Sequence, residues 1–161
     1  MDAKHIKYFE NLIGKDNAKF DKAHQIAYCY DATKKRYEPD GVLFPRDEND
    51  VSAILKYCNE NNIIIVPRGA GSGFTGGALA SSGGVVLSFE KHMNKILEID
   101  MQNMVAVVQP GVINMDLQKS SKKTSFPNHS FPKFWSDIGI IRQICNSVIS
   151  SINHLIILHI S

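Results

Sequence analysis

A glycine-rich stretch is the part of this sequence whose residue types could bind a ligand. It reads Pro67-Arg68-Gly69-Ala70-Gly71-Ser72-Gly73-Phe74-Thr75-Gly76-Gly77. Together with Gly83 and Gly84, it holds seven of the chain's eleven glycines within sixteen residues. Because glycine has no Cβ, its backbone can adopt positive φ and approach a ligand closely, so that successive N–H groups point at one centre. Such an array of donors suits phosphate oxygens, although a flexible loop without function would have the same composition.

The loop does not match either of two common phosphate-binding motifs. Gly71, Gly73 and Gly76 satisfy the G-x-G-x-x-G spacing, which in a nicotinamide-binding fold opens a long helix that directs its positive end at the pyrophosphate. Only eight residues, 77–84, precede the next apolar run, and three of them are glycines, so they cannot form that helix. A Walker loop is excluded because no Gly-Lys-Ser/Thr follows. The sequence therefore predicts that loop amides alone hold the phosphates.

A βαβ unit is expected to position this loop. Val42-Leu43-Phe44 predicts a strand, and Asp47 is placed to cap a helix whose apolar residues from Val51 to Cys58 share one face. The continuous β-branched run Ile63–Val66 predicts a parallel strand that is covered on both faces. The glycine loop leaves the carboxyl end of this strand, which is where open α/β sheets bind ligands.

The remaining elements complete an expected α+β fold: amino-terminal helices, the βαβ unit, and short strands. The apolar spacing predicts helices over 5–13 and 20–27. Short spacings leave no room for crossover helices between the later apolar runs, and they predict a mostly antiparallel meander of 85–89, 96–99 and 105–108.

The composition limits the classes of function that this chain could have. The chain has 161 residues, of which 43% are hydrophobic and 21% charged, as is ordinary for one folded domain. A net charge of +2 is too small to indicate a nucleic-acid partner. The three cysteines form no CxxC pair and the six histidines show no metal-ligand spacing, so we expect a reducing compartment and no metal site.

The polar start, Met1–His5, is unlike a secretion signal. Tyr28, Tyr30 and Tyr37 are interpreted as packing aromatics.

Three motifs in a fixed order point to a family. They are Pro39-Asp40-Gly41-Val42 with Pro45-Arg46, the glycine loop from Val66 to Gly77, and Val108-Gln109-Pro110-Gly111-Val112. With these motifs in this order, the chain resembles the vanillyl-alcohol-oxidase flavoproteins, which carry a p-cresol-methylhydroxylase-type FAD-binding domain. The resemblance covers roughly residues 28–118. Within that family, the chain resembles glycolate oxidase FAD-binding subunits and D-lactate dehydrogenases.

The resemblance implies FAD as the cofactor. The glycine loop would wrap the FAD pyrophosphate with main-chain amides, and the third motif would lie beside the cofactor at the end of a strand. The implied cofactor-binding residues are Pro67, Arg68, Gly69, Ala70, Gly71, Ser72, Gly73, Thr75, Gly76, Gly77, Pro110, Gly111 and Val112. Ser72 and Thr75 could add hydroxyl contacts. Arg68 could add positive charge near the phosphates or form a structural ion pair at the strand end.

The resemblance also implies a reaction, in which a hydride passes from the α-carbon of a 2-hydroxy acid, glycolate or D-lactate, to FAD. No catalytic residue can be carried over, because the family's acid–base and carboxylate-binding residues belong to a part without a counterpart here. We therefore expect the isolated chain to be inactive.

Glycolate-oxidase-type members work in the cytoplasm or at the inner face of the membrane, with another flavin subunit and an iron–sulfur subunit. The alternative is a non-catalytic fragment or interaction module that keeps the fold without flavin.

The composition changes near residue 120. Residues 1–119 hold 15 of the 16 acidic residues, and the remainder contains no glutamate. We therefore expect an amino-terminal helical lead (1–37), the first lobe of an FAD-binding domain (38–119) and an unmatched tail (120–161). We interpret the tail as a frame-shifted or otherwise aberrant end of a truncated flavoprotein. A natural short domain with its own helix over 138–160 is the alternative, and polar interruptions of that stretch argue against a membrane span.

Overall fold

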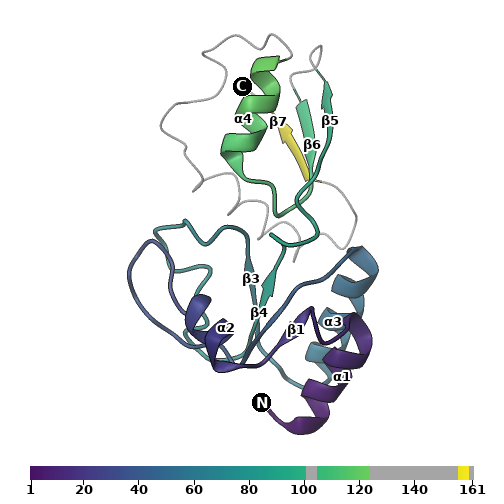
Figure 1. Cartoon of the computed structure of the whole chain (residues 1–161), viewed down its shortest axis with the longest axis vertical. Helices are drawn as coiled ribbons and strands as arrows, with labels where there is room; N and C mark the ends of the chain where they lie inside the picture. The colour runs from purple at the N-terminus through teal and green to yellow at the C-terminus, as the bar shows by residue number, and fades with distance from the viewer. Residues whose placement is uncertain (101–104, 124–155, 160–161) are drawn as a thin grey trace.

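The computed structural model describes residues 1–100, 105–123 and 156–159, and it has the expected α+β fold (Figure 1). Its larger sheet has the strand order β1-β2-β4-β3. Strands β2 and β3 each pair with β4 in parallel, whereas β1 pairs with β2 antiparallel. The strands are β1 (Ala18–Lys19), β2 (Gly41–Leu43), β3 (Ile65–Arg68) and β4 (Val85–Ser88).

Three helices accompany this sheet: α1 (Ala3–Ile13), α2 (Lys22–Ala27) and α3 (Glu48–Glu60). Helix α1 ends at Gly14, whose φ of 86° is a conformation that favours glycine. Helix α3 begins at Asp47, whose side chain accepts hydrogen bonds from the amides of Asn49 and Asp50. The predicted positions of these three helices are confirmed to within two residues.

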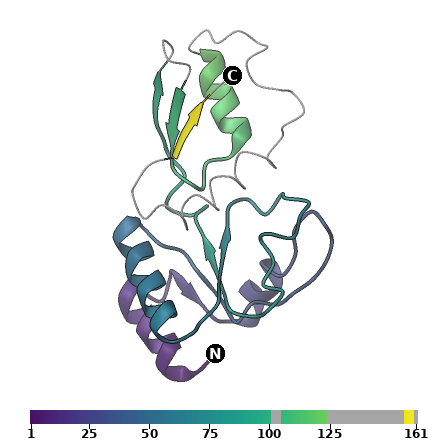
Figure 2. The same ribbon diagram turned by 180° about the vertical axis from the view of Figure 1, so that it is seen from behind.

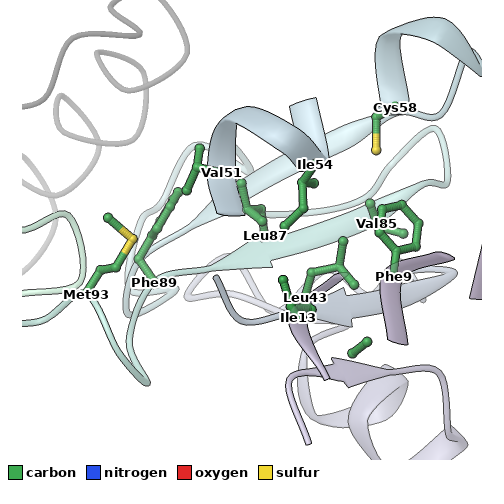
Figure 3. Close-up of a cluster of buried hydrophobic side chains, with 11 residues drawn as sticks. Phe9, Ile13, Leu43, Val51, Ile54, Cys58, Val85, Leu87, Phe89 and Met93 are labelled. Atoms are coloured by element: carbon green, nitrogen blue, oxygen red, sulfur yellow. The ribbon is translucent and has the colours of Figure 1, made fainter. Parts of the chain in front are cut away.

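The core lies on both faces of the larger sheet, because successive side chains of a strand point to opposite faces. Helices α1 and α3 pack side by side over one face (Figure 2). Figure 3 shows the buried side chains that they share with the sheet, which are Phe9, Ile13, Ala18, Leu43, Val51, Ile54, Cys58, Val85, Leu87, Phe89 and Met93. On the other face, Val42, Val66 and Val86 pack against Ala80 of the returning loop and against Tyr28.

The strand before the glycine loop differs from the prediction. Strand β3 begins two residues later than expected, so that Pro67 and Arg68 belong to the strand and not to the loop. Alternate residues of β3, Ile65 and Pro67, are only half-buried, so this strand is not fully covered on both faces. Among the described strands it pairs only with β4, at the edge of the sheet. Pro67 suits an edge position because it has no N–H to donate to a second neighbour.

The two inner strands are β2 and β4, and every residue of both is buried. The connection 69–84 crosses the sheet without a helix and returns β4 parallel to β3. The expectation of an antiparallel meander was therefore wrong for residues 85–89, because β4 pairs in parallel with β2 and β3 and does not share a sheet with residues 96–100 or 105–108.

A second sheet contains β5 (Ile96–Asp100), β6 (Val105–Val108) and β7 (Ile156–His159), all antiparallel. The predicted antiparallel pairing of β5 with β6 is confirmed. Helix α4 (Asn114–Lys123) crosses the boundary expected near 120. Residues 156–159 form a strand and not the end of a helix, and the rest of the tail beyond residue 123 lies outside the described residues. No helix within the described ranges has the length and apolar character needed to cross a bilayer.

Candidate functional site

The glycine loop presents backbone donors that the fold does not use. Gly71 and Gly76 have φ of +69° and +75°, in the left-handed region that favours glycine. A Cβ on Gly73 would meet no atom within 4 Å, and one on Gly77 would meet only Thr75 Oγ1 at 4.0 Å. Within the described part of the chain, the amides of these four glycines donate no hydrogen bond to another protein group. They are therefore available to a ligand.

No helix follows the loop, as predicted. The stretch 77–84 contains only turns and an isolated bridge. The amide of Leu79 donates to Gly76 O at 3.1 Å and that of Gly83 to Ala80 O at 3.0 Å, while Leu79 and Ala80 are buried. Because the loop does not lead into a helix within the described ranges, side chains beside it can supply the positive potential that a helix N-terminus would otherwise give.

Arg68 supplies that potential from beneath the loop. Its side chain lies at the end of β3, and the residue is only 7% exposed. Arg68 Nη1 donates to the carbonyl of Tyr30 at 2.9 Å, and Cζ lies 5.2 Å from the centre of the Tyr28 ring. A Cβ on Gly71 would lie 2.5 Å from Arg68 Cζ, which places the guanidinium directly against this turn.

The charge of Arg68 is not neutralised by a neighbour. No carboxylate in the described ranges lies within 4.0 Å of its guanidinium, so the ion pair considered from the sequence does not form there. A buried charge without a partner is costly, and an anion bound at the loop would offset that cost. Free amides above a buried cation thus fit a phosphate or pyrophosphate group.

Tyr28 does more than pack. Its hydroxyl donates a hydrogen bond to Glu90 Oε1, and its ring lies edge-on to Phe44 with centroids 5.7 Å apart. Burial, and then the hydrogen bond to Glu90, raise the pKa of Tyr28. Sequence reasoning missed this role because Tyr28, Arg68 and Glu90 are far apart in the chain and follow no local pattern. Figures 1 and 2 show the glycine loop beside the segment that follows α2, from which Tyr28 comes.

The third motif, residues 108–112, is connected to the end of β3 by contacts with Phe89. The amide of Phe89 donates to Arg68 O at 3.1 Å, and that of Gly111 donates to Met93 O at 2.7 Å. A Cβ on Gly111 would lie 2.6 Å from the carbonyl carbon of Phe89 and 2.8 Å from Met93 O. Pro110, Gly111 and Val112 are all buried. The structure thus brings both predicted segments to the carboxyl ends of β3 and β4.

The first motif holds the far end of the loop. Asp40 Oδ2 accepts a hydrogen bond from the amide of Gly84 at 3.0 Å, and the amide of Asp40 donates to Gly84 O at 2.7 Å. A Cβ on Gly84, which has φ of +93°, would lie 2.7 Å from Ile64 Cβ. Asp40 and Gly84 therefore have a structural role in closing the loop.

Comparison with known proteins identifies the family of the chain. Residues 39–135 match the family described as FAD binding domain. The chain belongs to this family. As an FAD-binding domain it has the cofactor expected from its motifs, and its residues fit that cofactor, because the FAD pyrophosphate is an anion that free amides and a buried cation can hold. The match extends beyond residue 119, and the domain boundaries stay predictions.

Its relatives are longer flavoproteins. The chain is 44% identical over 133 residues to the glycolate oxidase subunit GlcD of Bacillus subtilis, covering 79% of this chain and 28% of GlcD. It is 41% identical over 85 residues to the D-lactate dehydrogenase of Anaerostipes hadrus, covering 53% of this chain and 18% of that protein. The crystal structure of p-cresol methylhydroxylase with substrate bound matches with a TM-score of 0.67 and 26% identity, covering 77% of this chain and 25% of that one. This match confirms the predicted p-cresol-methylhydroxylase-type fold.

Proposed function

We propose that this chain is the amino-terminal FAD-binding lobe of an oxidoreductase that oxidises a small 2-hydroxy acid, glycolate or D-lactate. The observation that carries the proposal is the glycine loop, whose unused glycine amides lie next to the guanidinium of Arg68, a cation with no carboxylate partner in the part of the chain that the structure describes. The similarity to a glycolate oxidase subunit and to D-lactate dehydrogenases supports the substrate class. The chain spans 28% of the length of the first of these relatives and 18% of the second, so the activity is proposed for the whole protein.

Each part of the site has a distinct task in binding the cofactor. Bound FAD would accept the hydride from the α-carbon of the acid, while the protein binds and orients it. The amides of residues 69–77 donate to pyrophosphate oxygens, with the hydroxyls of Ser72 and Thr75 beside them. Arg68 would add positive potential from the end of β3, where Pro67 precedes it in the strand. Residues 110–112 pack against Phe89, and Phe89 in turn bonds to the end of β3, so these residues support the strand end from which the glycine loop begins. No catalytic residue is assigned within the described ranges.

Titration of the purified chain with FAD tests this proposal. Binding is followed by quenching of flavin fluorescence, and FMN serves as the matched control because it has the same ring without the pyrophosphate bridge. We expect FAD to bind more tightly than FMN, and ADP to compete with FAD. A chain that binds neither flavin, or binds FMN as tightly as FAD, would contradict the pyrophosphate site and favour a non-catalytic module that has lost its flavin.

The proposal extends to the partners and location of the whole protein. Electrons that reach the flavin need an acceptor, and we propose further oxidase subunits, including an iron–sulfur subunit, in the cytoplasm or at the inner face of the membrane. Purification of the tagged protein from its native cells tests this. The absorbance of an iron–sulfur cluster should elute together with the flavin, and a flavoprotein that elutes alone while oxidising its substrate would exclude the subunit assembly.

A further inference from the structure

The guanidinium of Arg68 is enclosed by three neighbours. The ring of Tyr28 faces it with 5.2 Å between Cζ and the ring centre, the carbonyl of Tyr30 accepts from Nη1 at 2.9 Å, and the Gly71 turn closes the remaining side. In the described part of the chain, the Tyr28 ring and the Tyr30 carbonyl are the electron-rich groups with a recorded contact to this cation. A cation over an aromatic face is attracted by the ring quadrupole, and the attraction grows when water is excluded.

Tyr28 is itself held in place at both ends. Its hydroxyl donates to Glu90 Oε1, and its ring packs edge-on against Phe44 at an interplanar angle of 75°. The amide of Tyr28 donates to His24 O at 3.0 Å at the end of α2. These contacts fix the face that the ring turns toward Arg68, so the ring forms a rigid platform for the guanidinium.

We propose that Tyr28 is a positioning residue: its ring holds the Arg68 guanidinium against the Gly71 turn, where the charge acts on a bound diphosphate. This inference rests on the proposed function, since it needs the glycine loop to bind the FAD pyrophosphate. It assigns Glu90 the lesser task of orienting the ring through the phenol. It also explains why a residue from the end of α2 lies against the end of β3.

Ring-retaining and ring-free variants at Tyr28 test the proposal through FAD affinity. Tyr28→Phe keeps the ring and loses only the hydroxyl, so we expect the FAD dissociation constant to stay within about twofold of the unsubstituted value. Tyr28→Leu removes the ring, and we expect FAD to bind about 5- to 30-fold more weakly, the range of a partly to fully desolvated cation–π contact. An equal loss in both variants would show that the ring face does not matter, and would overturn the proposal.

A double-mutant cycle with Arg68 separates positioning from general packing. If Tyr28 acts through Arg68, Tyr28→Leu should weaken FAD binding little or not at all in an Arg68→Met background. The same loss in both backgrounds would refute the role. Circular dichroism checks that each variant folds, and Tyr28→Met gives a second ring-free variant if leucine is not tolerated.

The outcomes also separate this inference from the proposed function. If the unsubstituted chain binds no FAD, the proposed function fails and the inference fails with it. If that chain binds FAD and Tyr28→Leu binds it equally well, only the positioning role is overturned.

Discussion

Alanine at Gly71 should damage the fold and the site together, because this position combines a special backbone conformation with a close neighbour. Its φ of +69° disfavours any residue with a Cβ, at a cost of roughly 1–2 kcal/mol. The new Cβ would also lie 2.5 Å from Arg68 Cζ, so the guanidinium must shift. This shift adds little to the cost, because the guanidinium is the far end of a flexible side chain. We therefore expect Gly71→Ala to lower the free energy of unfolding by roughly 1–2 kcal/mol, most of it from the backbone conformation.

Gly73→Ala is the matched control, because its Cβ would enter open space and its φ is not positive. Thermal unfolding followed by circular dichroism should show a fall of roughly 2–8 °C for Gly71→Ala, whereas Gly73→Ala should melt near the unsubstituted chain. FAD titration should show weaker binding for both, because a methyl at residue 73 occupies space above the free amides. Equal melting of the two variants would refute the account of the Gly71 turn. Unchanged FAD affinity in Gly73→Ala would refute the role of the loop amides.

Two further predictions concern the elements that support the site. Gly111→Ala would place a Cβ 2.6 Å from the carbonyl carbon of Phe89, where only backbone could yield, so we expect urea unfolding to show a loss of roughly 2 kcal/mol. The bidentate Arg46 guanidinium lowers the pKa of Asp50 below its ordinary value of 3.8. The stabilisation from this pair is therefore complete above that value and is lost as the pH falls through the lower folded pKa. The stability difference between the unsubstituted chain and Asp50→Asn should be constant near neutral pH and shrink below pH 4, and a difference that persists in acid would contradict this assignment.

Local signals predicted the helices well, because each depends on a few adjacent residues. Asp47 caps α3 and Gly14 ends α1, and both effects act within one turn of the helix. The absence of a helix after the glycine loop was predictable for the same reason, since residues 77–84 are too few and too rich in glycine. The nature of the bound group was likewise predictable from the order of the three motifs.

The arrangement of the strands was not predictable from periodicity. An apolar run such as Ile63–Val66 has the composition of a central strand, but the neighbours of a strand depend on pairing with distant residues. The overlooked signal was Pro67, which fits an edge strand better than a central one. The contact between Tyr28 and Arg68 left no signal at all, because it depends on how α2 and β3 come together.

The site gains its positive potential at a cost in stability. A helix N-terminus offers about half a unit charge without burying a side chain, whereas this loop uses a whole guanidinium that is 7% exposed and has no carboxylate partner within the described ranges. The Tyr28 ring and the Tyr30 carbonyl offset only part of its lost hydration. Replacing even a buried ion pair by apolar side chains of similar volume is often neutral or stabilising, and a buried cation without a paired carboxylate costs more still. We therefore expect Arg68→Met to leave the melting temperature of the FAD-free chain unchanged or raised while it weakens FAD binding. A markedly lower melting temperature of the FAD-free variant would show that Arg68 stabilises the fold, and would contradict the view that its buried charge is kept at a cost in stability in order to bind the cofactor.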